Sequence, residues 1–474
     1  MLFNTLEFAI FLPIVFVLYW SFEKKKWILL LASYFFYASW DYRFLSLLLL
    51  SSFTDYTLAH LIDNKPNNSK KRKILLGISI FINLGILIYF KYANFFIDTF
   101  CDTFRLLGIH FSTTSMQLIL PLGISFYTFQ TLSYTIDVYY KRIPACKNLL
   151  SFLIYVSYFP QLVAGPIEKA QTLLPQFTSK KKFKYRYAVD GMRQMAWGTF
   201  KKVVIADNCA LYVDYYFDNF HTQNGVTLLF IACLFSFQIY TDFSGYSDMG
   251  IGISKLFGIE LSDNFKQPYF SRNFYEFWKR WHISLNNWFR DYVYIPLGGN
   301  KKPFRNIIVV FLISGLWHGA SWNFVAWGAI HSLFYMSYIF LKNKKKYTTP
   351  INADSPTLIT EFLSVLLTFL ITTLAWVFFR ASSITQAIAF IKQLITHFSG
   401  KINVLQLGSF PFILLFFLVL AMLSIEWYTR YKPHPMSNLE ESYKTLPRFM
   451  IYTLLIITIL FLGGGSQAFI YFQF

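Results

Sequence analysis

Long apolar segments, separated by short polar or basic ones, recur along the whole chain. An α-helix needs about 20 residues to cross a bilayer, and most of these segments come close to that length. We therefore predict an all-α polytopic membrane protein with spanning helices at 5–22, 27–40, 44–62, 74–90, 116–136, 226–240, 358–379, 410–425 and 449–462.

Three further segments do not fit a simple span. Residues 149–166 are apolar but end in FPQLVAGP, whose prolines and glycine predict a re-entrant or half-buried element. Residues 189–217 mix charged and apolar positions, which predicts an amphipathic helix in the membrane interface, and 385–397 predicts a weaker one. Together with residues 306–340, the pattern predicts roughly ten to twelve transmembrane or re-entrant elements.

Composition and charge agree with a membrane protein. Apolar residues make up 55% of the chain and charged residues 14%, whereas about a quarter of a soluble domain is charged. The net charge of +19 could also suit nucleic-acid binding, but no basic cluster belongs to a soluble fold. The clusters instead follow the positive-inside pattern of short cytoplasmic loops. Counting spans from these loops predicts a single membrane domain over 1–474 with both termini on the outer face.

The segment 264–340 differs from the rest, because it holds three of the eight histidines and six of the twelve tryptophans. Its last part, 306–340, contains His318 and His331 but no Asp, Glu, Lys or Arg. Ionisable side chains at membrane depth are costly and are functional candidates by default. Basic clusters on both sides predict that 306–340 enters and leaves on the inner face as two short helices, with His318 near their turn.

His318 lies in SGLWHGAS, where Gly315 and Gly319 would let another backbone or a substrate come close. A neutral imidazole there can act as a general base toward a hydroxyl. The alternative is a buried histidine bonded to a carbonyl oxygen. His331, thirteen residues later, points away from His318 on a continuous helix, so we expect it to support the site or the fold. A helix break near Asn323 or Gly328, which would allow a shared site, is the alternative.

His282 lies in a segment that predicts one helix with two distinct faces. Aromatic residues recur every three or four positions on one face, and Lys279, His282, Asn286 and Arg290 share the neighbouring face. An imidazole, an amide and a guanidinium on one stripe suit the binding of a polar or anionic group. The alternative, an interfacial helix with a tryptophan belt and solvated charges, stays open.

Two carboxylates, Asp242 and Asp248, lie close to Gly245 and Gly250 at the end of a predicted span. This combination predicts irregular backbone that lines a wet cavity. The sequence contains no HExxH motif, cysteine cluster, Walker loop or GxSxG elbow, so we predict neither a metal site nor a permanently bound cofactor.

The residues around the first two histidines read WKRWHISLNNWFRDYVYIPLGGN and SGLWHGASWNFVAWGAIH. They resemble the membrane-bound O-acyltransferase (MBOAT) family, in its bacterial alginate O-acetyltransferase-like branch. In this family an Asn, Asp or His on one helix precedes a histidine on a later helix, and His282 and His318, 36 positions apart, match these two positions. The resemblance continues in SYFFYASWDYRFL, LPLGISFYTFQTLSYTIDVY, YFPQLVAGPI, YTDFSGYSDMGIG and FIYFQF.

The resemblance implies a ring of helices around a central funnel that narrows near His318, with the catalytic core at about 116–340. It implies a cytoplasmic thioester donor, acetyl-CoA, in a bacterial inner membrane. The acetyl group would pass outward to a periplasmic or extracellular SGNH-hydrolase-like partner, which modifies a polysaccharide or peptidoglycan. His318 would be the base, and His282 or Asn286 would stabilise the oxyanion. The residues that would line or support this site are Asn286, Arg290, Trp317, Asp242 and His331.

The closing FIYFQF resembles a short aromatic C-terminal motif whose tyrosine is proposed to carry the acyl group in the related teichoic-acid D-alanylation system. The resemblance makes Tyr471, in the tail 466–474, a candidate acyl acceptor with His318 as base. Glycines at 463–465 would let the tail fold back toward the outer funnel. An interfacial aromatic anchor is the alternative interpretation.

Other functions stay open at this point. The runner-up is a transferase of the same family that takes D-alanine from a carrier protein. The PLGGN motif, the extra C-terminal span and the tail on the same chain resemble the acetyltransferase branch and therefore favour an acetyl donor. A transporter or flippase would usually show two related halves, and no second copy of the histidine region is present. A membrane scaffold whose soluble partner does the chemistry is the third alternative. Alginate, peptidoglycan, cellulose and other exopolysaccharides all fit as acceptors.

Overall fold

The regular elements of the computed structural model are helices. No strand occurs in the residues that the structure describes, which are 1–67, 69–110, 116–163, 165–344, 358–404, 411–465 and 467–470. The all-α prediction is therefore confirmed. The chain folds into two compact units, one formed by 1–191 with 253–262 and the other by 192–252 with 263–474. One domain with a catalytic core at about 116–340 stays a prediction.

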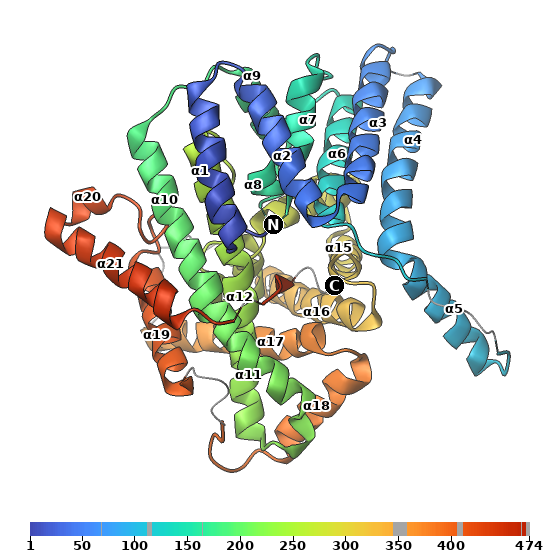
Figure 1. The fold of residues 1–474 in the computed structure, drawn as a ribbon. Helices are drawn as coiled ribbons and strands as arrows, with labels where there is room; N and C mark the ends of the chain where they lie inside the picture. Colours follow the sequence, from blue (N-terminus) through green and yellow to red (C-terminus); the bar gives the residue numbers. More distant parts are fainter. Residues whose placement is uncertain are drawn as a thin grey trace. The chain divides into compact units, whose positions relative to one another are not determined.

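The first unit contains α1 (Leu6–Ser21), α2 (Lys25–Asp41), α3 (Leu45–Asp63), α4 (Lys70–Leu87), α5 (Ala93–Leu106), α6 (Ile124–Tyr139), α7 (Leu149–Ser157), α8 (Phe159–Leu162) and α9 (Ala170–Thr178). Helices α3, α4 and α6 lie side by side (Figure 1). Asp55 of α3 is buried among them and accepts hydrogen bonds from Ser79 (2.5 Å), Asn83 (2.8 Å) and Thr135 (3.1 Å). These bonds join three helices at one point.

The helices at two predicted segments of this unit, 116–136 and 149–166, can be compared with the boundaries that the sequence predicted. The span expected at 116–136 begins only at Ile124, after Gly123 with φ +68°. A Cβ at Gly123 would lie 2.6 Å from the carbonyl oxygen of Leu162, so the helix start is set by a close backbone approach. The apolar segment 149–166 is broken into α7 and α8, as its prolines predict.

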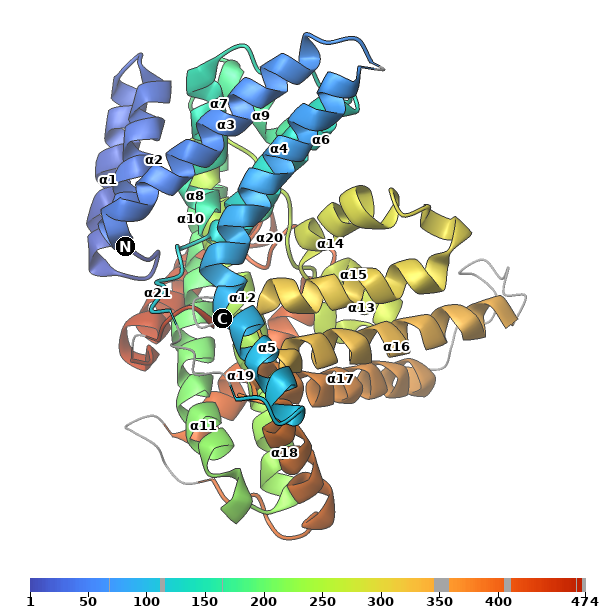
Figure 2. The ribbon, with the colours of Figure 1, turned by 90° about the vertical axis from the view of Figure 1, so that its right-hand side faces the viewer.

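The second unit contains α11 (Asp207–Asp218), α13 (Phe274–Arg280), α14 (Ile283–Phe289), α15 (Pro303–His318), α16 (Trp322–Lys344), α17 (Leu358–Arg380), α18 (Ile384–Thr396), α19 (Phe412–Tyr428), α20 (Leu439–Ser442) and α21 (Thr445–Leu462), with most of α10 (Tyr185–Thr199) and α12 (Gly225–Leu256). Helices α15, α16 and α17 are stacked one beside the next (Figure 2). The residues 306–340 thus form two helices, as predicted.

Among the described residues, five helical stretches are long and apolar enough to cross a membrane by length and composition: Lys25–Asp63, Lys70–Leu106, Gly225–Leu256, Leu358–Arg380 and Thr445–Leu462. Shorter apolar helices lie at Leu6–Ser21, Leu149–Leu162, Pro303–His318, Ile384–Thr396 and Phe412–Tyr428. Each predicted span overlaps a helix of the structure, although several boundaries differ.

The predicted interfacial helix at 189–217 is wrong. This segment runs through α10, a π-helix at Phe200–Ala206 and α11, and residues 204–210 are all buried. Its mixed charges, which suggested an interface, are paired inside the protein: Lys202 Nζ lies 2.6 Å from Asp207 Oδ1 and 2.7 Å from Asp242 Oδ1. Paired charges can be buried where isolated ones cannot.

The irregular backbone predicted around Asp242 and Asp248 is also wrong, because α12 is continuous through both residues. The glycines serve a different purpose. A Cβ at Gly245 would lie 2.8 Å from the carbonyl oxygen of Gly198, and a Cβ at Gly198 would lie 2.5 Å from that of Gly245. Two glycines therefore let α10 and α12 touch through their backbones.

Candidate active site

His282 lies at a sharp break between two helices. Helix α13 ends at Arg280, α14 begins at Ile283, and His282 has φ +44°, in the left-handed region that non-glycine residues seldom adopt. The single helix predicted across this segment is therefore wrong. Asn286 Nδ2 donates to the carbonyl oxygens of Trp278 (2.7 Å) and Trp281 (2.6 Å), which would otherwise lack helical partners.

Asn264 holds the other side of this break. Its carbonyl oxygen accepts the Ile283 N–H (2.9 Å) and its side-chain oxygen accepts the Ser284 hydroxyl (2.9 Å). Its amide Nδ2 donates to Ser247 Oγ of α12 (3.2 Å). Since Asn264 is fully buried, these bonds fix the first turn of α14 to α12.

His318 is the last residue of α15, at the turn of the hairpin with α16, as predicted. Glycines bring the two helices together: a Cβ at Gly315 would lie 2.3 Å from the carbonyl oxygen of Phe324, and one at Gly328 would lie 2.3 Å from that of Phe311. The imidazole packs edge-on against aromatic rings, at centroid distances of 5.0 Å from Trp317, 5.1 Å from Trp327 and 5.4 Å from Phe379.

The fold brings His282 and His318 together. Their ring centroids are 6.5 Å apart, and the residues are 1% and 2% exposed. Trp317 packs against both rings, with its centroid 5.8 Å from His282. Two imidazoles at this separation, away from water, can act on the same small group, one as a base and one as a hydrogen-bond donor.

His331 and His318 both pack against Trp327. The Trp327 ring centroid is 4.8 Å from His331 and 5.1 Å from His318, and Trp278 lies 5.1 Å from His331. Within the described part of the chain, no hydrogen bond reaches the ring nitrogens of His331. This environment makes His331 part of an aromatic core.

The predicted polar stripe does not form a shared surface. The guanidinium of Arg290 is exposed and bonds to Asp291, with Nε 2.8 Å from Oδ1. The amide of Asn286 is occupied by backbone carbonyls. Among the described residues, His282 is the one member of this stripe whose ring contacts that of His318.

Asp242 connects the site to the end of the chain. Its Oδ1 pairs with Lys202, and its Oδ2 accepts the Ile470 N–H at 2.7 Å. The next residue, Phe243, packs on His282 with a centroid distance of 4.7 Å and on Phe469 with one of 5.7 Å. Residues 467–470 therefore reach the wall of the histidine site. Tyr471 lies outside the described residues.

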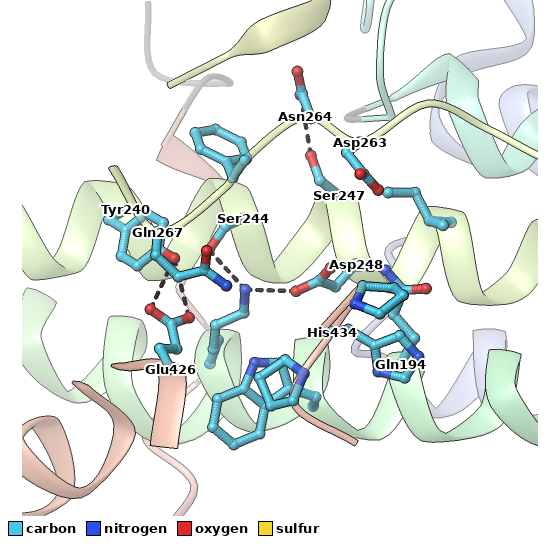
Figure 3. A pocket seen from close by; sticks show the side chains of 16 residues that line it. Gln194, Tyr240, Ser244, Ser247, Asp248, Asp263, Asn264, Gln267, Glu426 and His434 are labelled. Atoms are coloured by element: carbon cyan, nitrogen blue, oxygen red, sulfur yellow. Dashed lines mark hydrogen bonds and ion pairs between the residues drawn. The ribbon is translucent and has the colours of Figure 1, made fainter. Parts of the chain in front are cut away.

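A polar pocket is lined by Tyr240, Ser244 and Asp248 of α12 (Figure 3). Lys201 Nζ, inside it, lies 2.5 Å from Asp248 Oδ2 and 2.9 Å from Ser244 Oγ. The Tyr240 hydroxyl lies 3.0 Å from both carboxylate oxygens of Glu426. The pocket is also lined by Asn264 and by Phe265, whose ring centroid is 6.3 Å from His282. No three His, Cys, Asp or Glu side chains gather as metal ligands within the described ranges.

Comparison with known proteins identifies the family. Residues 140–350 match the membrane-bound O-acyltransferase family, MBOAT. The chain is 37% identical over 438 residues to the peptidoglycan O-acetyltransferase of Helicobacter pylori. This alignment covers 83% of this chain and 80% of the Helicobacter protein. The chain is 34% identical over 491 residues to the probable alginate O-acetylase of Pseudomonas putida, covering 98% of both. The chain belongs to the membrane-bound O-acyltransferase family.

A more distant relative is the teichoic acid D-alanyltransferase of Bacillus subtilis, 28% identical over 269 residues, which cover 53% of this chain and 67% of that one. The matched family segment includes both His282 and His318. As a member of this family, the chain is a multi-pass membrane protein and an acyltransferase.

Three residues of this MBOAT protein that shape the site escaped the sequence reasoning: Asn264, Lys201 and Glu426. One of them carried a usable signal. Glu426 is the one charged residue between 412 and 428, and a lone carboxylate in an apolar helix is a functional candidate. Asn264 and Lys201 lie in polar stretches, where nothing local distinguishes them.

Proposed function

We propose that this acyltransferase moves an acetyl group from a cytoplasmic thioester, acetyl-CoA, to hydroxyl groups of a polysaccharide or peptidoglycan outside the membrane. The observation that carries the proposal is the buried pair His282 and His318, 6.5 Å apart between ring centroids. Similarity to proteins named peptidoglycan O-acetyltransferase and probable alginate O-acetylase supports the acetyl group and the acceptor class.

In the proposed reaction His318 removes the proton from the attacking hydroxyl as its oxygen bonds to the thioester carbonyl carbon. The carbon–sulfur bond then breaks, and the leaving thiolate takes the proton and departs as a thiol. The negative charge that develops on the carbonyl oxygen needs a hydrogen-bond donor. That role falls to His282, since the amide of Asn286 is already bonded to two backbone carbonyls.

Tyr471 is the proposed first acceptor of the acetyl group. Support comes from its neighbours: Phe469 and Ile470 are buried, and Phe469 is joined to His282 through Phe243. From the tyrosine ester, an SGNH-hydrolase-like partner on the outer face of a bacterial inner membrane would pass the acetyl group to the glycan. Both termini would then lie on that outer face.

Replacing Tyr471 with phenylalanine removes the hydroxyl and keeps the aromatic ring. We expect this variant to insert normally and to lose acetylation of the glycan in cells, because no ester can form at position 471. The measurement is the acetyl content of the isolated cell-envelope glycans beside a deletion strain. Full acetylation by Tyr471→Phe would rule out the carrier role and favour an aromatic anchor.

The second candidate is D-alanyl transfer from a carrier protein, which the similarity to the teichoic acid D-alanyltransferase favours. Purified protein, incubated with radiolabelled acetyl-CoA or with a radiolabelled D-alanyl carrier protein, separates the two. We expect thiol release and label on the protein with acetyl-CoA only. Label from the carrier protein alone would establish D-alanyl transfer, and no label from either would point to a transporter or a scaffold.

A further inference from the structure

We infer that Lys202, Asp207 and Asp242 form a buried clamp that holds the C-terminal strap, residues 463–465 and 467–470, beside His282. The clamp itself stands on geometry alone. Its consequence for acyl transfer, the positioning of the residues that follow the strap, rests on the proposed function.

The charges of the clamp explain why it binds a peptide backbone. Lys202 Nζ lies 2.6 Å from Asp207 and 2.7 Å from Asp242, and the three side chains are only 1%, 2% and 4% exposed. One ammonium group shared by two buried carboxyl groups leaves carboxyl oxygens that it cannot satisfy alone. Further hydrogen-bond donors must stabilise them, because water does not reach them. The backbone N–H of Ile470 supplies one, 2.7 Å from Asp242 Oδ2.

The strap is bound at several points along its length. Lys202 Nζ donates to the carbonyl oxygen of Gln467 at 3.1 Å, so the same lysine contacts both carboxylates and the strap. The Gly464 N–H donates to the Val203 carbonyl oxygen in the π-helix at 2.9 Å. Asn208 Nδ2 donates to the Leu462 carbonyl oxygen, also at 2.9 Å, where α21 ends.

Two glycines lie where the strap crosses the π-helix, and both are tightly packed. A Cβ at Gly463 would lie 2.8 Å from Val203 Cγ1, and one at Gly464 would lie 3.1 Å from the backbone nitrogen of Asn208. A side chain at Gly463 would force a shift of the strap or of Val203, and one at Gly464 would crowd the π-helix backbone. π-Helical turns are often found at functional sites, and here one provides the surface on which the strap lies.

The end of the strap contacts residues that pack against the histidine site. Phe469 is fully buried, with its ring centroid 4.5 Å from that of Tyr246 and 5.7 Å from that of Phe243. Phe243 in turn packs on His282 at 4.7 Å. Charge-assisted hydrogen bonds are directional, so they fix the register of the strap as well as its attachment. Lys202, Asp207 and Asp242 are thus positioning residues.

The test uses the full-length protein with Ile470→Cys, whose introduced thiol reports on strap release. In this parent protein the thiol should react slowly with a maleimide, as measured by mass spectrometry of the peptide that contains it, because Ile470 is buried. Adding Lys202→Met should raise the labelling rate roughly tenfold or more, since charge-assisted bonds no longer oppose local opening. The matched control is Lys201→Met, which breaks the neighbouring ion pair with Asp248 and should leave labelling slow.

The outcomes separate the clamp from the proposed function. Unchanged labelling in Lys202→Met, or an equal rise in Lys201→Met, would overturn the clamp whatever the activity. Faster labelling with full transfer from acetyl-CoA to the glycan would leave the clamp standing and refute its role in transfer. If Lys202→Met does not accumulate, Asp242→Asn replaces it. That variant keeps an oxygen for Ile470 but loses the charge, so labelling should rise, and unchanged labelling would count against the clamp.

Discussion

Replacing His318 with alanine should lower acyl transfer by roughly 10²–10⁴-fold, the usual contribution of a general base. The imidazole is the buried group at the turn of the α15–α16 hairpin and faces His282. Without it, the attacking hydroxyl keeps its proton as the carbonyl carbon is approached. The measurement is thiol release from labelled acetyl-CoA by purified, membrane-inserted protein.

The matched control is His331→Ala, which removes another buried imidazole that packs against Trp327. It should lower the thermal midpoint of unfolding and keep most of the transfer activity. The transfer activity of His282→Ala should lie between those of His318→Ala and His331→Ala, because loss of one oxyanion donor lowers the rate roughly 10²–10³-fold. Normal transfer by a well-folded His318→Ala variant would remove His318 from the mechanism.

Replacing Gly315 with alanine should disable the site without touching either histidine. A Cβ there would lie 2.3 Å from the carbonyl oxygen of Phe324, a separation that real Cβ atoms do not reach. Helices α15 and α16 must then move apart, and overpacking of this kind costs about 1–3 kcal/mol. His318 ends α15 and moves with it, and a displacement of about 1 Å can cost about 10²-fold in rate.

Two measurements check the Gly315 prediction: the thermal midpoint of unfolding in detergent, and acetyl transfer well below that temperature. The control is Gly77→Ala in α4, where a Cβ would meet nothing within 4 Å. It should be neutral or slightly stabilising, because alanine favours a helix more than glycine does. A Gly315→Ala variant that behaves like Gly77→Ala would show that close helix packing is not needed for the position of His318.

Local pattern was sufficient to locate the long apolar helices and part of the site. Apolar segments of spanning length located the helices, and the charge-free run with its glycines located the hairpin that ends in His318. These features depend on residues close together in the chain. The motifs around His282 and His318 pointed to the family that the comparisons establish.

The break at His282 could not be predicted from helical spacing. Residues at intervals of three and four form faces only if the helix continues, and here it stops at Arg280 and resumes at Ile283. Bonds from Asn264 and Asn286 hold the break, and Asn264 lies outside the periodic pattern. An intact helix would have aligned Asn286 with His282; the broken one uses its amide for backbone carbonyls.

The sequence by itself determined where most of the long apolar helices lie and which histidines could carry the chemistry. Only the tertiary structure decided which charges meet. Lys202 pairs with Asp242, forty positions away, and Asp242 accepts the N–H of Ile470 near the end of the chain. The energy of such a buried cluster depends on all its members being present together, so no single stretch of sequence reveals it.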